Sequence, residues 1–351
     1  MLKKILCLAL LAAGTASCCC INEDLSDCPP KDQAVEHQVE YELQLITNIT
    51  TELETELSMQ AEAEVQQKLR QYLSNIFTDY AHDIRLNFYN PEEPHQILEH
   101  FEETMNANQK VYVLTIPRRP YRHLGIANLR NNTRVNLEET DFANSLSIRQ
   151  KKADAIGCHE TGLFSARYDM DIAEEATEDQ IFHVRLYMLN CAAALVLDNA
   201  TGVEVKDVSA TATGFYSDFQ VNDSTYLDNQ PQTIVRADPI RLTSGNKMAF
   251  CTVNMPSGET PMASRMVIET EEPFLATELQ DALWQYRVYV TMPDGKVTES
   301  ILGIRTPLRA GQLKIIKGRL TEDGSVEPYD ATVGVSVTLN WNNGGEHEVE
   351  L

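Results

Sequence analysis

Three adjacent cysteines, Cys18, Cys19 and Cys20, have the residue type and the setting for covalent attachment of lipid. They directly follow small residues, and Thr15-Ala16-Ser17-Cys18 fits a loose form of the signal at which a bacterial lipoprotein is processed and acylated. The thiol takes a diacylglycerol, and the new N-terminus usually takes a third acyl chain. One chain, at about 0.8 kcal/mol per buried CH₂, binds a membrane only marginally, whereas stable anchoring needs two signals. We predict lipidation at Cys18, with Cys19 and Cys20 as alternatives and a secreted, disulfide-bonded protein as the other interpretation.

The residues before these cysteines are typical of a secretory signal peptide. Lys3 and Lys4 precede an apolar run over residues 5–13 that is too short to span a bilayer, and small residues follow it. We therefore predict a signal peptide over residues 1–17 and a lipidated N-terminal segment over residues 18–34.

The composition is that of a globular and strongly acidic chain. Its 351 residues suffice for two domains, and 43% of them are hydrophobic. Lys and Arg total 29 against 52 Asp and Glu, which gives a formal net charge of −23. A polyanion of this charge repels phosphate backbones, so nucleic acid is excluded as a partner.

Four more cysteines, Cys28, Cys158, Cys191 and Cys251, are scattered through the rest of the chain. The oxidising cell envelope permits disulfides among them, but their spacing does not fix a pairing. Buried free thiols are the alternative that remains open.

Catalytic signatures such as GxSxG, HExxH and GxGxxG do not occur in the sequence. Cys158-His159-Glu160 contains the three residue types of thiol chemistry, but chain neighbours rarely converge in space, so a turn beside a strand is expected there. His95 and His100, five residues apart on a segment that could be helical, would point to different faces. The acidic stretch 169–179 lacks the glycine and spacing of a calcium loop. We predict no enzyme activity, no cofactor and no metal.

Hydrophobic periodicity predicts a mostly β chain with a helix in its first half. Residues 35–45 alternate as a half-buried strand, and residues 61–80 have helical spacing and should lie across a sheet. Short strands separated by turn residues predict two antiparallel β-sandwich domains, over residues 35–172 and 173–351. The acidic stretch would form the linker between them.

The last predicted strand, residues 331–341, has Val333, Val335 and Val337 on one face. Such a strand could pair with another subunit, because an open sheet edge offers unpaired backbone groups. The plainer interpretation, which we favour, is a core strand of the second sandwich.

Three segments near the ends of the chain form a recognisable set: Glu23-Asp24-Leu25-Ser26-Asp27-Cys28-Pro29-Pro30, Pro307-Leu308-Arg309-Ala310-Gly311-Gln312 and Val333-Gly334-Val335-Ser336-Val337-Thr338-Leu339-Asn340-Trp341. They resemble the FimB/Mfa-type fimbrial anchor family of Bacteroides-like bacteria. The cysteine triplet and Asn340, where Asp is common, depart from the family pattern. Glu23 and Asp24 resemble a signal for export to the outer face of the outer membrane.

The resemblance implies two transthyretin-like sandwiches, a lipid-anchored and surface-exposed position at the fimbrium base, and a role in holding the fibre and limiting its length. It also implies that fimbrial subunits join by donor-strand pairing. Related stalk subunits lose their lipidated piece to an arginine-directed protease, but residues 18–67 here contain no arginine. The first, Arg70, lies in the predicted helix, where cleavage is disfavoured. We therefore expect a tethered anchor.

Two other functions remain open. A stalk or tip adhesin subunit would share the fold, and a surface glycan-binding lipoprotein would need exposed aromatic side chains on one sandwich face. The two tryptophans, Trp284 and Trp341, both suit a core.

Overall fold

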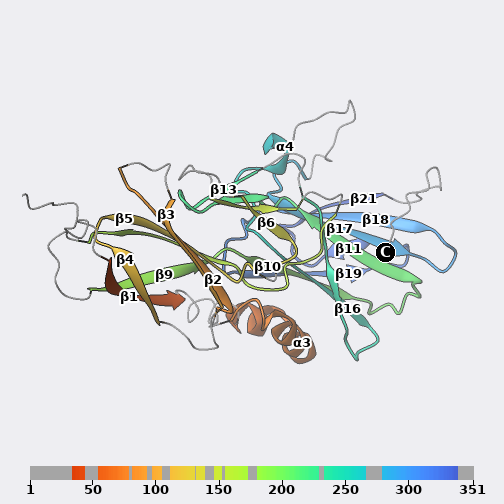
Figure 1. Cartoon of the computed structure of the whole chain (residues 1–351). Helices are drawn as coiled ribbons and strands as arrows, with labels where there is room; N and C mark the ends of the chain where they lie inside the picture. The colour runs from red at the N-terminus through yellow and green to blue at the C-terminus, as the bar shows by residue number, and fades with distance from the viewer. Residues whose placement is uncertain are drawn as a thin grey trace, which may run out of the picture.

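The computed structural model describes residues 34–43, 54–78, 81–92, 97–104, 111–130, 132–138, 146–151, 155–172, 180–228, 233–265 and 279–338. Within these residues the strands form four sheets, which confirms the prediction of a mostly β chain with a small helical part (Figure 1). No helix among them is both long and apolar enough to cross a membrane.

The first sandwich contains a seven-stranded sheet with the order β3-β2-β5-β8-β9-β1-β4. A four-stranded sheet with the order β13-β12-β7-β6 packs beside it. The bounds of these strands are β1 (Ala34–Leu43), β2 (Asp83–Tyr89), β3 (Ile97–Thr104), β4 (Val111–Pro117), β5 (Tyr121–Ala127), β6 (Val135–Glu138), β7 (Ser147–Gln150), β8 (Phe164–Met170), β9 (Gln180–Met188), β12 (Asp218–Gln220) and β13 (Thr225–Leu227).

The seven-stranded sheet folds over on itself. Its strands β8 and β9 share only the pairs Phe164↔Met188 and Ser165↔Tyr187, so the sheet turns at that point. Val39 and Leu114, from the β4-β1-β9 part, therefore lie in one core with Phe88 of the β3-β2-β5-β8 part. The other face of β5 and β2 packs on the four-stranded sheet, so the first sandwich has three layers. This second interface includes Leu124, Ile126, Ile148 and Phe219.

The second sandwich consists of two five-stranded sheets with the orders β15-β16-β10-β19-β20 and β14-β11-β17-β18-β21. Their strands are β10 (Cys191–Asp198), β11 (Asp207–Thr213), β14 (Val235–Arg236), β15 (Asp238–Ile240), β16 (Lys247–Asn254), β17 (Trp284–Thr291), β18 (Val297–Ile304), β19 (Leu313–Leu320), β20 (Val326–Pro328) and β21 (Gly334–Thr338).

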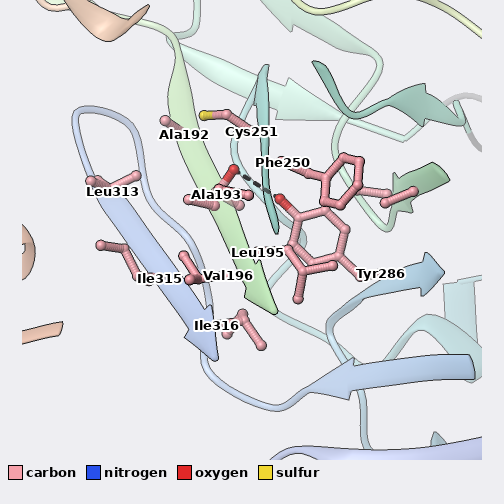
Figure 2. Packing of buried hydrophobic residues seen from close by; sticks show 14 of the residues in the cluster. Ala192, Ala193, Leu195, Val196, Phe250, Cys251, Tyr286, Leu313, Ile315 and Ile316 are labelled. Atoms are coloured by element: carbon pink, nitrogen blue, oxygen red, sulfur yellow. Dashed lines mark hydrogen bonds between the residues drawn. The ribbon is translucent and has the colours of Figure 1, made fainter. Parts of the chain in front are cut away.

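Tyr286 ties the two sheets of the second sandwich together through the core. Its hydroxyl donates a 2.8 Å hydrogen bond to the backbone oxygen of Ala193 on the opposite sheet, and its side chain is fully buried (Figure 2). A buried hydroxyl must find a partner, and here the partner is a strand carbonyl. The bond therefore fixes how β17 lies over β10.

The same strand arrangement occurs in both sandwiches. In the first, β1 lies between β4, which is antiparallel to it, and β9, which is parallel. In the second, β10 lies between antiparallel β16 and parallel β19. The sheets are thus mostly antiparallel, as predicted, with one parallel pair in each sandwich.

The sheets divide the chain differently from the predicted boundary at residues 172 and 173. Strand β9 follows that boundary but belongs to the first sandwich, because it pairs with β8 and β1. Strands β12 and β13 also belong to the first sandwich, because β12 pairs with β7 and β13 pairs with β12. The acidic composition of residues 169–179 indicated a linker, whereas the division between sheets falls between β9 and β10.

The helical segment comprises residues 54–60, which are helical, and α3 (Ala63–Leu73); a short helix, α4 (Met262–Arg265), lies elsewhere. We call residues 54–78 the strap. The predicted helix over residues 61–80 is confirmed in place but ends earlier, at Leu73. The strap lies across a sheet, as expected, and that sheet belongs to the second sandwich, whose core cluster includes five buried strap residues: Leu57, Val65, Leu69, Leu73 and Ile76 (Figure 1).

Small side chains on β10 explain why the strap packs so closely. Val196 and Val65 line the same shallow depression, so Val196 faces the strap. Strand alternation places Ala192 and Ala194 on that face as well. Alanines leave room for a helix to approach the sheet, and all of these residues belong to the same core.

Candidate functional site

The predicted lipidation sites, Cys18, Cys19 and Cys20, lie outside the described residues, as does Cys28. Lipidation therefore remains a prediction. The first described segments after these cysteines are β1 and the strap.

Carboxylates of the strap bind backbone groups of the second sandwich. Glu64 accepts hydrogen bonds from the backbone N–H and hydroxyl of Thr243 and from the N–H of Ser244 at 3.3 Å. These bonds favour the charged form and lower the pKa of Glu64 to about 2. Glu56 accepts from the N–H of Ile315 at 3.0 Å.

Other polar contacts fasten the two ends of α3. Glu62 forms an ion pair with Lys247, and the Tyr72 hydroxyl donates to Asp238 Oδ2 at 2.5 Å. Burial raises the pKa of Tyr72, and the nearby Asp238 adds to this effect. These contacts have no signal in the sequence, where the strap carboxylates look like the solvated face of an amphipathic helix.

Arg70, the first arginine after the predicted lipidation sites, lies on α3 as predicted. Its guanidinium forms two hydrogen bonds with the Glu54 carboxylate, at 2.7 Å from Nε and 2.5 Å from Nη2. Both side chains are nearly half exposed, at 48% and 42%, so the pair is a surface ion pair. The backbone around Arg70 is nevertheless held in a helix whose neighbours Leu69 and Leu73 are fully buried.

Among the strands that the structure describes, β21 is the last of its sheet, and it pairs with β18 from Gly303↔Gly334 to Glu299↔Thr338. The predicted strand over residues 331–341 is thus present in part, and residues 339–351 lie outside the described residues. Val333 is buried, whereas Val337 is 38% exposed. The strand is built into the second sandwich, as the favoured interpretation had it, and forms an edge rather than the middle of the sheet.

A second edge carries exposed apolar side chains on its outer face. Val113 on β4, 60% exposed, and Ile181 on β9, 55% exposed, lie on either side of Gln38 on β1 in one row across the three strands. The next row contains Glu40, whose carboxylate lies 3.0 Å from His183. The outer face of this part of the sheet is therefore partly apolar and close to the terminal strand β4.

The three neighbours Cys158, His159 and Glu160 do not converge, as expected. The Cys158 thiol donates to the Arg236 oxygen at 3.2 Å, and Glu160 pairs with Arg134. His159 Nδ1 lies 2.8 Å from the amide nitrogen of Asn190, which donates to it. Burial lowers the pKa of His159 to about 4 and raises that of Cys158 to about 11, so neither group suits nucleophilic catalysis near neutral pH.

The other candidate ligands are also dispersed. His95 lies outside the described residues, and His100 lies on strand β3 rather than on a helix, with Nδ1 at 2.5 Å from the Asn87 side chain. Asp169 pairs with Arg122 at 2.9 Å. Across the part of the chain that the structure describes, no group of three or more His, Cys, Asp or Glu side chains could hold a metal ion.

The described cysteines, Cys158, Cys191 and Cys251, are buried free thiols. Burial raises the pKa of each. Trp284 is also buried, and its indole N–H donates to the Thr306 oxygen at 2.9 Å, which confirms a core position. Trp341 lies outside the described residues.

No family model matches the sequence, and no curated protein matches it. Solved structures match most of the chain. An adhesin candidate from Bacteroides ovatus has 11% identity and a TM-score of 0.50, covering 89% of this chain and 97% of that one. The fimbrial anchor protein Mfa2 from Porphyromonas gingivalis has 10% identity and a TM-score of 0.47, covering 88% and 100%. A polysaccharide-binding candidate from Bacteroides thetaiotaomicron has 11% identity and a TM-score of 0.49, covering 84% and 98%.

At 11% identity, the match to the Bacteroides ovatus structure establishes a shared fold. The matched structures named here are a fimbrial anchor protein, an adhesin candidate and a polysaccharide-binding candidate.

Proposed function

We propose that this chain is an outer-membrane lipoprotein that anchors a fimbria to the cell surface and limits the length of the fibre. Two kinds of support are independent of each other. The motifs at both ends of the sequence resemble fimbrial anchors, and the fold is shared with a Bacteroides ovatus adhesin candidate. Acyl chains of the palmitate type on Cys18, or on Cys19 or Cys20, would provide the attachment.

The placement of Arg70 is the observation on which the anchoring role rests. A stalk subunit must be released from its lipid, and an arginine-directed protease can act here only at or after Arg70. Proteases bind an extended segment, whereas Arg70 lies in a helix that is packed on the second sandwich. The folded protein would therefore keep its lipid and stay attached.

Strand pairing is the proposed means of joining fimbrial subunits. Strand β21 stands at a sheet edge and leads into the C-terminal residues, and β4 ends another sheet beside an apolar outer face. A sheet edge can accept or donate a strand, with alternate side chains setting the register. Fimbrial subunits are thus the expected protein partners.

A fimbrial stalk or tip adhesin subunit is the first alternative, and the fold fits it equally. The strap favours the anchor, because it protects the first available cleavage site. A glycan-binding lipoprotein that stacks sugars on tryptophan is less well supported, since Trp284 is fully buried.

Recovery of the protein from cells tests the proposal. We expect it in the outer-membrane fraction, labelled by palmitate, with a mature N-terminus at Cys18, and co-purifying with fimbrial subunits. Cys18→Ala should abolish labelling, while Cys7→Ala, in the predicted signal peptide, is the matched control. Deletion of the gene should give long fibres that are shed. Unlipidated protein in the medium, or a mature N-terminus beyond Gln67, would contradict the anchoring role.

A further inference from the structure

The chain passes from the first sandwich to the second at Asn190, which lies between β9 and β10 and is fully buried. Its side-chain Oδ1 accepts the N–H of Leu163, just before β8 of the first sandwich, at 2.5 Å. Its backbone oxygen accepts the N–H of Gly311, just before β19 of the second sandwich, at 2.7 Å. Its side-chain Nδ2 donates to His159 Nδ1 at 2.8 Å. We call these four residues the junction.

His159 is the hydrogen-bond acceptor within the junction. Its backbone N–H donates to the Val253 oxygen on β16 at 3.0 Å, and the residue is only 1% exposed. Because an amide nitrogen can only donate, Nδ1 must accept, so the imidazole is neutral and carries its proton on Nε2. Nε2 has no hydrogen-bond partner among the described residues. A buried polar atom without a partner is uncommon in proteins and needs an explanation.

A second proton on this imidazole is incompatible with the hydrogen bonds of the junction. It would sit on Nδ1 and face the amide N–H of Asn190, so that two donors would meet. Rotation of the Asn190 amide does not help, because the amide nitrogen would then face the N–H of Leu163. The imidazolium would thus be buried without an acceptor for its new proton, which is costly. The closed junction therefore requires a neutral His159.

The charged groups around His159 do not compensate for this cost. Burial is the main cause that lowers the pKa of His159 to about 4, and the nearby guanidinium of Arg134 lowers it further. Glu160, the next residue, is paired with Arg134 at 3.2 Å and is 63% exposed. Cys158 stays neutral, because burial raises its pKa to about 11. Strand β16 and the connection from β9 to β10 present uncharged groups to the imidazole.

We propose that His159 and Asn190 form a pH-sensitive switch between the two sandwiches, which is closed while the imidazole is neutral and opens when the imidazole takes up a proton. The switch does not depend on lipid attachment or on fimbrial partners. In an opened junction the imidazole meets water and titrates near its ordinary pKa of 6.5, whereas in the closed junction it resists protonation down to about 4. The stabilising contribution of the closed junction is therefore complete above pH 6.5 and is lost as the pH falls towards 4.

Hydrogen exchange of the purified full-length chain at pH 7 and pH 4.5 tests the switch. After correction for intrinsic exchange, the N–H groups of Leu163 and Gly311 should lose protection by roughly 60-fold, as a pKa difference between 6.5 and about 4 requires. The N–H groups of β17, in the centre of the second sandwich, should keep theirs. Another buried histidine, His123, also has a pKa lowered by burial, but it contacts the Asn87 oxygen, so its titration would affect β2 and β5.

Three variants separate the switch from a purely structural role. Asn190→Asp supplies a carboxylate that can accept from both Leu163 and a protonated His159, so the junction should stay protected at pH 4.5, and NMR titration should give the imidazole a pKa above 6.5. His159→Gln cannot take up a proton, so its junction should show no change between pH 7 and 4.5. His183→Gln is the matched control, because that imidazole is 71% exposed, and it should behave as the natural chain does.

NMR titration of the natural chain keeps the proposal testable even if a variant does not fold. The proposal is overturned if the imidazole of His159 titrates near pH 6.5 in the natural chain, or if Leu163 and Gly311 are equally protected at pH 7 and pH 4.5. It is also overturned if they lose protection only together with β17, or if the loss persists unchanged in folded His159→Gln.

Discussion

Replacement of Leu69 by alanine should make Arg70 accessible to an arginine-specific protease. Leu69 is fully buried between α3 and the second sandwich. Leu→Ala changes in protein cores lower the free energy of unfolding by about 2–5 kcal/mol. Because a helix on the outside of a sheet can shift and partly fill the cavity, we take a loss of about 3 kcal/mol for docking of the strap. If cleavage follows transient opening of the strap, each 1.4 kcal/mol changes the open fraction tenfold. Cleavage after Arg70 should therefore accelerate roughly 100-fold.

The assay is limited proteolysis of the folded protein, with mass spectrometry of the fragment that ends at Arg70. Gln71→Ala changes an exposed residue of the same helix and should have almost no effect. Glu54→Gln removes only a surface ion pair, worth at most about 1 kcal/mol, and should accelerate cleavage no more than about fivefold. Rapid cleavage after Arg70 in the natural chain, or an unchanged rate in Leu69→Ala, would refute the idea that the docked strap protects this site.

Three further predictions concern the strap and the core of the second sandwich. Hydrogen bonds from Thr243 lower the pKa of Glu64 to about 2, so the stabilising contribution of Glu64 should be complete above pH 4.5 and fade as the pH falls towards 2. Hydrogen exchange of α3 should become faster over this pH range. In Glu64→Gln, the part of this pH dependence that comes from Glu64 should be absent. Tyr286→Phe should lower the free energy of unfolding by about 1–3 kcal/mol in urea titration, because it deprives the Ala193 carbonyl of a buried donor; an unchanged midpoint would contradict this. The Cys158 thiol, whose pKa burial raises to about 11, should resist alkylation at pH 8 until the protein unfolds, and rapid labelling of the native chain would disprove its burial.

Local patterns in the sequence predicted the strands and helices that have one buried face and one exposed face. The alternation of residues 35–45, for example, corresponds to β1. Strand β3 was missed because its sequence, ILEHFEET, is rich in charged residues, as an edge strand can be.

Features that depend on long-range contacts could not be predicted in the same way. The parallel pairing of β1 with β9 joins residues that are more than a hundred positions apart, and no local pattern encodes it. The helix was identified, but its partner sheet was not, because alanines such as Ala192 and Ala194 carry no helix-docking signal until the sheet is assembled.

The route of the chain after the proposed lipid site has a mechanical consequence for an anchor. The described fold begins with β1, which is a central strand that shares seven residue pairs with β4 and seven with β9. A pull on the proposed lipid directed along β1 would load both ladders at once, so many hydrogen bonds must break together, whereas the same pull on an edge strand would load one ladder. The chain then forms the strap on the second sandwich, so the N-terminal part of the described fold is fastened to both halves (Figure 1). Such an attachment suits the proposed anchor, because an anchor must resist the drag on a fibre.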